Sequence, residues 1–232
     1  MSIILQCENL SKRYGKEYAL SNINLTLETG RIVGLLGPNG SGKTTLIKLA
    51  AGMIMPTEGR IQIGGADPGP ETKRITAYLP DKEFLPEDRK ICDLIWLYDT
   101  FFPDFDRQKA LDMAADLNLP ENVPMKKLSK GNREKLQLIL TMSRNAQLYL
   151  LDEPIGGADP AAREYILRTI IRNYSENATV VLSTHLISEV EQILDEAVFM
   201  DKGSILFHRT IDVIRQTEGK SADTLFRELY RC

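Results

Sequence analysis

The chain has 232 residues, 43% of them hydrophobic and 26% charged, which is ordinary for a water-soluble globular protein. A formal net charge of -3 argues against an extended nucleic-acid surface, because duplex binding needs clustered cations. No stretch approaches the ~20 apolar residues of a membrane-spanning helix, so we expect no direct span. The three scattered cysteines, Cys7, Cys92 and Cys232, predict no zinc site and fit a reducing compartment.

The first part of the chain predicts short strands separated by turns. Their apolar patterns lie within residues 2–10, 23–27, 31–36, 55–65 and 74–80. A helix is expected over residues 45–51, after a glycine-rich turn. From about residue 82 to residue 145 the sequence becomes helical in character. The pattern therefore predicts a strand-rich core interrupted by a helical insertion.

Strands return over residues 147–153 and 178–185. Between them, Asp159 is a predicted N-cap and Pro160 a predicted first helical residue. A hairpin is expected to turn at Lys202 and Gly203, and two short helices are expected around residues 211–216 and 221–230.

The turn before the first helix carries a phosphate-binding pattern. It reads GLLGPNGSGKTTLIKLA over residues 34–50, with glycines at Gly37, Gly40 and Gly42. Backbone N–H groups in such a turn can converge on an anion at the start of the helix. Lys43 adds a cation and the Thr44 hydroxyl can hold a magnesium ion, as in the P-loop pattern G-x-x-x-x-G-K-[ST]. The sequence therefore predicts a nucleoside triphosphate site.

The segment LYLLDE, residues 148–153, is predicted to be a buried strand that ends in two carboxylates. Ligands bind at the carboxyl ends of such strands in α/β sheets. Asp152 is placed to support magnesium, and Glu153 to polarise an attacking water molecule. A strand that merely runs into an acidic loop is the alternative, and the upstream P-loop favours the functional interpretation.

Two further motifs are weaker taken singly. Ser129 and Gly131, in LSKGN, form an anion site at a helix start or else an ordinary cap. His185, in STH, is by itself more typical of a satisfied polar group than of a catalyst.

Together, and in this order, the motifs resemble those of the nucleotide-binding subunit of an ATP-binding-cassette (ABC) transporter, over nearly the whole chain. The resemblance implies an α/β fold: a P-loop NTPase core, an N-terminal antiparallel β subdomain and an inserted α-helical subdomain. It implies one domain over residues 1–232, with the core at 1–81 and 146–232 and the helical subdomain at about 82–145.

The resemblance also implies roles for particular residues. Tyr14, in KRYG, is similar to the aromatic residue that stacks on adenine, and Gly156 to Asp159 (GGAD) to the D-loop. Catalytic roles fall to Lys43, Glu153 and His185. The Walker A loop would bind ATP through Gly37, Pro38, Asn39, Gly40, Ser41, Gly42, Lys43, Thr44 and Thr45. Ser129 and Gly131 would contact the γ-phosphate bound to a second subunit, and the family works as a dimer that closes over two ATP molecules.

Two positions depart from the family pattern. Asp81 stands where the family usually has a glutamine, so it would either join Thr44 and Asp152 as a magnesium ligand or point elsewhere. Lys130 interrupts the commoner LSGGQ signature, as a solvated surface residue or an extra counter-ion. The aromatic stretch at 95–105 is expected to be core of the helical insertion or a lip of the groove that receives a permease.

The leading interpretation is an ATP-hydrolysing subunit, with ATP and Mg²⁺ as cofactors, that powers transport through a separate membrane permease. The overall character of the sequence resembles that of bacterial drug- or peptide-export ATPases. We expect a cytoplasmic protein, peripheral at the membrane, partnered by the permease and by a second nucleotide-binding subunit (identical or not), without nucleic acid. One alternative is a soluble ABC-type ATPase acting on nucleic acid or ribosomes, although such chains usually carry a coiled-coil insertion or two cassettes. Another is a different P-loop enzyme, such as a small-molecule kinase.

Overall fold

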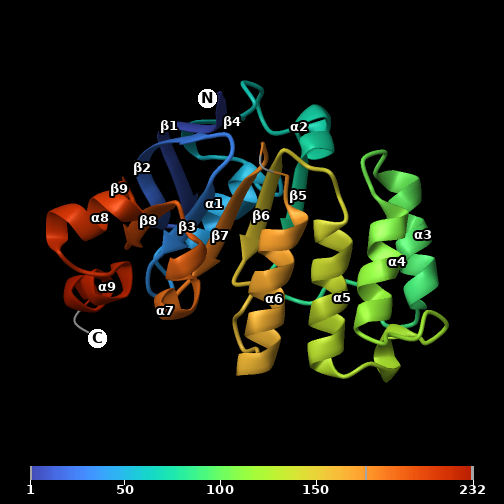
Figure 1. Cartoon of the computed structure of the whole chain (residues 1–232). Coiled ribbons are helices and arrows are strands. Elements are labelled where there is room, and N and C mark those ends of the chain that lie inside the picture. Colours follow the sequence, from blue (N-terminus) through green and yellow to red (C-terminus); the bar gives the residue numbers. More distant parts are fainter. Residues whose placement is uncertain (1, 176, 231–232) are drawn as a thin grey trace.

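Two β-sheets form the framework of the chain, which a computed structural model describes over residues 2–175 and 177–230 (Figure 1). The first sheet is antiparallel and has the strand order β2 (Glu17–Glu28), β1 (Ile3–Tyr14), β4 (Glu58–Ile63). In the second sheet only β9 is antiparallel to its neighbour, and the order is β5 (Thr76–Leu79), β6 (Leu148–Asp152), β7 (Thr179–Thr184), β3 (Ile32–Leu36), β8 (Glu196–Asp201), β9 (Ser204–Thr210). The predicted α/β fold with an N-terminal antiparallel sheet is confirmed.

The helices divide into those that cover the sheets and a group inserted in the chain between β5 and β6. The first set comprises α1 (Lys43–Ala50), α2 (Pro70–Ile75), α6 (Pro160–Asn173), α7 (Ile187–Val190), α8 (Ile211–Glu218) and α9 (Ala222–Tyr230). The inserted group comprises α3 (Ile91–Phe101), α4 (Arg107–Asp116) and α5 (Lys130–Met142). These three stand side by side next to α6, with α5 nearest to it (Figure 1).

The parallel strands of the second sheet are largely buried on both faces, as expected for strands between two layers, whereas the antiparallel edge strand β9 is partly exposed. On β6, Leu148 and Leu150 pack in a core shared with α1 and the antiparallel sheet. Tyr149 and Leu151 face the opposite core, which the inserted helices and α6 to α9 complete. Because these strands are parallel neighbours, their carboxyl ends lie at one edge of the sheet, and the predicted site residues follow these ends.

Several turns form where local sequence signals placed them. The Asp159 carboxylate accepts a hydrogen bond from the Ala162 N–H at 2.9 Å, so it caps α6 as predicted. The hairpin between β8 and β9 turns at Lys202 and Gly203, both with positive φ. The short helix α2 was not predicted, because its six residues fit no amphipathic repeat. Cys7 and Cys92 are free thiols, and Cys232 lies outside the described residues.

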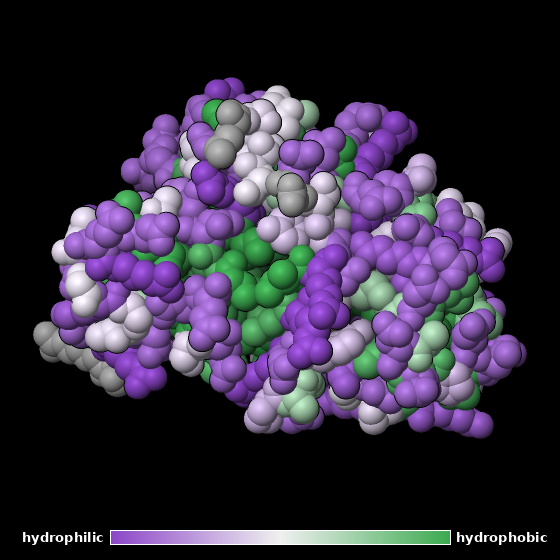
Figure 2. Space-filling model, viewed as in Figure 1, coloured by the Kyte–Doolittle hydropathy of each residue, from purple (hydrophilic) through white to green (hydrophobic). Residues whose placement is uncertain are grey.

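The aromatic stretch at 95–105 divides between core and surface. Ile95 and Phe105 are buried, whereas the side chains of Trp96 and Phe101 are 57% and 69% exposed. The core interpretation therefore holds for the buried part of the stretch, and a permease-facing lip stays a prediction for the exposed part. On the face seen in Figure 2, apolar side chains gather in a hollow over the strands between α6 and α7.

Arg144 fixes the junction where the chain leaves α5 and returns to the sheet. Its side chain is 3% exposed, and its Nε lies 2.6 Å from Asp104 Oδ1. Its other nitrogens donate to the backbone carbonyls of Arg74 and Thr76 at 2.7 and 3.3 Å, and the guanidinium lies 4.1 Å from the Phe102 ring centre. One buried cation thus ties the inserted helices to β5.

Candidate active site

Close packing requires glycine at two positions of the loop between β3 and α1, Gly37 and Gly42. A Cβ on Gly37 would lie 2.3 Å from the Met200 carbonyl oxygen, and one on Gly42 would lie 2.7 Å from that of Ala19. Gly42 also has φ +105°, a left-handed value that L side chains rarely adopt. At Gly40, with φ +82°, no atom lies within 4 Å of the Cβ position. The loop therefore packs tightly against the protein on one side and is open at its tip.

Lys43 begins α1 and turns its side chain back into this loop. The ammonium donates to the carbonyl oxygens of Gly37 and Pro38 at 2.8 and 3.1 Å, and lies 3.5 Å from Glu153 Oε1. Burial lowers the pKa of Lys43, and the nearby Glu153 and Asp152 carboxylates oppose that shift. A cation held by carbonyl dipoles and one carboxylate is suited to binding a phosphate oxygen.

Asp152 ends β6 beneath the loop, with its two oxygens in different environments. Its Oδ1 accepts hydrogen bonds from the hydroxyls of Ser183 and Thr44 at 2.7 and 3.0 Å. Its Oδ2 is buried and has no hydrogen-bond partner. Burial is the main reason that the pKa of Asp152 is raised, and the two hydroxyls oppose the shift. A buried, unpartnered carboxylate oxygen beside the Thr44 hydroxyl fits the oxygen ligands that Mg²⁺ prefers.

Glu153 follows Asp152 in a strained backbone conformation, with φ +48°. Its N–H donates to Ser183 Oγ at 2.9 Å, and its Oε2 lies 3.1 Å from His185 Nδ1. Lys43 approaches the other carboxylate oxygen, so Glu153 is held between a cation and an imidazole. Strain of this kind persists where surrounding contacts hold it, and it concentrates at functional sites.

Ser183 is the residue of this cluster for which sequence reasoning assigned no role. Its hydroxyl donates to Asp152 Oδ1 and accepts from the Glu153 N–H, so it links the two carboxylate residues. Ser183 pairs in register with Asp152 across β6 and β7. In the sequence, the only signal for Ser183 was its position at the start of the STH motif. That it lies beside Asp152 follows only from the register of the two strands.

One pocket of about 390 Å³ collects most of the predicted nucleotide-binding residues. It is lined by Tyr14, Ala19, Asp81, Glu153 and residues 39–45. Tyr14 is half exposed, with Lys12 Nζ 5.4 Å from its ring centre. Asp81 is exposed and lines this pocket together with Glu153. Residues that are far apart in the chain, such as Thr44 and Glu153, thus line the same pocket.

Ser129 and Gly131 lie away from this pocket, at the N-terminus of α5. Ser129 is exposed, and its hydroxyl oxygen caps the helix by accepting from the Asn132 N–H at 3.3 Å. Lys130 is 69% exposed and lies 3.5 Å from Glu134, which favours the solvated-surface reading of that residue. The signature segment therefore faces outward from its own chain's site.

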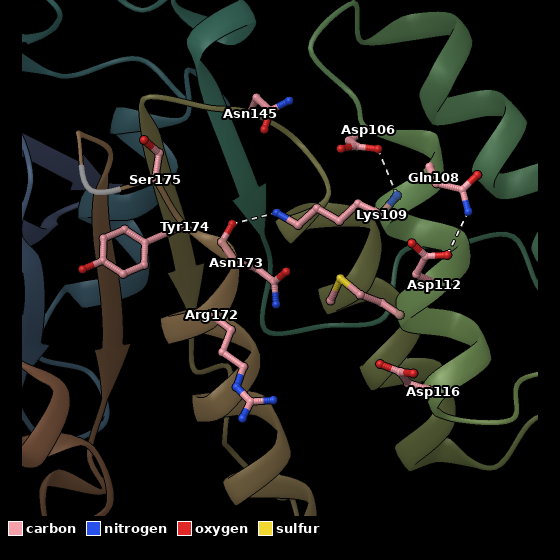
Figure 3. Close-up of a pocket in the computed structure, with 11 residues that line it drawn as sticks. Asp106, Gln108, Lys109, Asp112, Asp116, Asn145, Arg172, Asn173, Tyr174 and Ser175 are labelled. Carbon is pink, nitrogen blue, oxygen red and sulfur yellow. Dashed lines mark hydrogen bonds between the residues drawn. The ribbon is translucent and has the colours of Figure 1, made fainter.

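A larger cavity of about 550 Å³ lies elsewhere, between α4 and the end of α6 (Figure 3). Lys109 reaches across it from α4 and donates to the Asn173 carbonyl at 2.7 Å, while its own N–H donates to Asp106. Burial lowers the pKa of Lys109. None of the predicted site residues lines this cavity, so it belongs to the contact between the inserted helices and the core.

The side-chain oxygen atoms of the site indicate which metal ion it could bind. Within residues 2–175 and 177–230, no group of three or more His, Cys, Asp or Glu side chains is arranged to hold a metal ion. Mg²⁺ is usually held by one or two protein oxygens together with substrate phosphates, and Thr44 with Asp152 matches that pattern. The Ser41 hydroxyl in the loop is also buried without a partner. These residues fit a magnesium–nucleotide complex.

Comparison with known proteins identifies the class. The model of the ABC transporter family matches residues 20–156, and the chain belongs to this family. It is therefore an ABC-type ATPase. Its fold is similar to a solved structure described as the ATP-binding subunit of an ABC transporter, with a TM-score of 0.88 and 28% identity over 98% of this chain and 99% of that one.

Two curated relatives carry descriptions of a transport role. A lantibiotic transport ATP-binding protein of Streptococcus pyogenes is 29% identical, over 90% of this chain and 92% of that protein. A Nod factor export ATP-binding protein of Ralstonia nicotianae is 30% identical, over 86% of this chain and 65% of that protein. Among the described residues, no helix combines the length and apolar character needed to cross a bilayer.

Proposed function

We propose that the chain binds ATP with Mg²⁺ and hydrolyses it to drive export through a separate membrane permease. The observation that carries the proposal is the Glu153 carboxylate, held at the P-loop pocket between Lys43 and His185. Export is favoured by the Ralstonia relative, which is described as an export ATP-binding protein, and by the resemblance of the sequence to bacterial export ATPases. The permease would hold the protein at the cytoplasmic face of the membrane.

In this proposal each side chain has a separate task. Lys43 neutralises phosphate charge, and the Thr44 hydroxyl and Asp152 hold the cation. Glu153 accepts a proton from the attacking water molecule as a general base. His185, within hydrogen-bond distance of Glu153 Oε2, orients that carboxylate. Bound Mg–ATP supplies the phosphoanhydride bond that is broken.

A second nucleotide-binding subunit is part of the proposal. Ser129 is exposed and, with Gly131, lies outside its own chain's pocket, so these residues are available to complete a site on another chain. ATP should therefore promote dimer formation. The dimer should be most stable in Glu153→Gln, because this variant does not hydrolyse the ATP that holds the two subunits together. Light scattering measures this directly. A monomer at saturating ATP and magnesium, with the permease present, would contradict the second-subunit proposal.

The catalytic assignment is tested by two substitutions with opposite signatures. Glu153→Gln should keep ATP affinity and lower turnover by roughly 10²-fold or more, the range for loss of a general base. Lys43→Ala should instead weaken ATP binding, measured by calorimetry. Glu189→Gln is the matched control, since that carboxylate is 41% exposed and pairs with Arg163. Wild-type turnover in Glu153→Gln would show the role to be misassigned.

A further inference from the structure

A small cavity is lined in part by the carboxylate residues of the candidate active site. It encloses about 30 Å³ and is lined on its polar side by Asp81, Glu134, Asp152, Glu153 and Gln137. A buried water molecule needs a cavity of roughly 10–15 Å³ and two to four polar partners. The cavity is therefore large enough for one water molecule and has the polar groups to bind it.

The chemistry of the lining is unequal. Ionised carboxylates accept hydrogen bonds but do not donate them, whereas an amide does both. Of the residues that line the cavity, all of which the structure describes, Gln137 alone carries a side-chain donor. A water molecule placed there can donate hydrogen bonds to the carboxylates. The only side chain of the lining that can donate a hydrogen bond to that water molecule is Gln137.

The orientation of the Gln137 amide follows from its one fixed contact. Gln137 lies on α5 and is 4% exposed, and its Oε1 accepts from the Phe84 N–H at 2.9 Å. A backbone N–H can only donate, so the carbonyl half of the amide must face Phe84. The Nε2 half is left for the cavity that Gln137 lines. Nε2 is not among the buried side-chain atoms that lack a partner, so a water molecule in the cavity can reach it and accept its hydrogen bond.

We propose that Gln137 is a positioning residue for hydrolysis: its Nε2 holds a water molecule in this cavity against the carboxylates of Asp81 and Glu153. The inference rests on the proposed function. It assigns to α5 the amide donor that the loop after β5 lacks, because that loop carries a carboxylate at Asp81. The same amide holds Phe84, three residues further along the loop, so one side chain orders both the loop and the water.

The competing explanation is that Gln137 merely braces the Phe84 backbone. A double-mutant cycle separates the two, using Gln137→Met, Asp81→Gln and the double variant. Gln137→Met should lower kcat about tenfold, within the range of couplings between residues in contact, and leave the Kd for ATP within about twofold. With Asp81→Gln present, the loop carries its own amide donor, so the same change should lower kcat about twofold or less. A brace alone predicts an equal loss in both backgrounds.

Thr141→Val is the matched control. Its hydroxyl is buried on the same helix and donates to the Gln137 carbonyl at 2.8 Å, but Thr141 does not line the cavity. This change should leave kcat unaltered.

A readout that needs no catalysis is a high-resolution crystal structure of the wild-type protein. We expect an ordered water molecule within hydrogen-bond distance of Gln137 Nε2 and one of the carboxylates, and its loss in Gln137→Met. An empty cavity in the wild type, or equal kcat losses in the cycle, would overturn the inference even if Gln137→Met folds poorly. Glu153→Gln run in the same assay keeps the two questions apart. If Glu153→Gln also hydrolyses ATP at the wild-type rate, the catalytic role that the proposed function gives to Glu153 fails; if it is inactive, a failed cycle counts against Gln137 alone.

Discussion

Replacing Asp152 by asparagine should stabilise the protein without nucleotide while weakening its response to Mg–ATP. The amide would keep the hydrogen bonds from Thr44 and Ser183 and remove a buried charge whose Oδ2 has no partner. Burial raises the pKa of Asp152, so at neutral pH its ionised form destabilises the folded state. That penalty lifts as pH falls toward the raised pKa, because the folded state then binds the proton more tightly than the unfolded chain.

The expected size follows from the cost of one unsatisfied buried group. An unpaired buried polar atom costs about 1–3 kcal/mol, and the asparagine Nδ2 keeps part of that cost. We therefore expect a net gain of about 1 kcal/mol, or a rise in Tm of about 2–4 °C for a domain of this size. Mg–ATP at 100 times its Kd should add about 2.7 kcal/mol to the wild type. A tenfold weaker Kd would reduce that gain to about 1.4 kcal/mol.

Calorimetric unfolding with and without Mg–ATP measures both effects in one series. Glu153→Gln is the control, because that carboxylate is already paired with Lys43 and His185 and its removal should not raise Tm. A lower Tm for Asp152→Asn without nucleotide would refute the argument from the unpartnered oxygen. A Mg–ATP shift equal to that of the wild type would refute its role as a cation ligand.

Three further predictions concern other groups. Asp81→Asn should weaken the magnesium dependence of the ATPase rate more than ATP binding, and Asp81→Gln should at least match wild-type turnover; superimposable magnesium titrations would make Asp81 a bystander. The hydrogen bond from His208 at 2.6 Å lowers the pKa of Glu196, so its stabilising effect is present above the ordinary Glu pKa and is lost as pH falls through the lowered value. The difference in unfolding free energy between wild type and Glu196→Gln should therefore shrink in acid, and a constant difference would count against this pair. Arg144→Met should cost about 3 kcal/mol in denaturant unfolding, because it leaves Asp104 without its buried partner; a change under about 0.5 kcal/mol, the level of a neutral surface substitution, would contradict it.

Local signals in the sequence were enough for the elements that the chain makes by itself. The glycines before Lys43 predicted the loop, the Asp159–Pro160 pair predicted the start of α6, and the Lys202–Gly203 pair predicted the hairpin. Each of these depends on backbone conformation or a cap within a few residues. The helix α2 was missed because six residues hold too little periodicity.

By itself, the sequence determined which chemical groups the site contains and in what order they occur along the chain. Only the tertiary structure decided how they meet. Thr44 and Asp152 are 108 residues apart yet share a hydrogen bond, and the register of β6 and β7 places Ser183 where its hydroxyl donates to the same Asp152 oxygen. It also placed Gln137 at the same small cavity as Asp152 and Glu153, and Ser129 outside the nucleotide pocket. The physical reason is that these contacts arise when strands buried on both faces pack in one register, and no pattern within a single segment specifies which strand lies beside it.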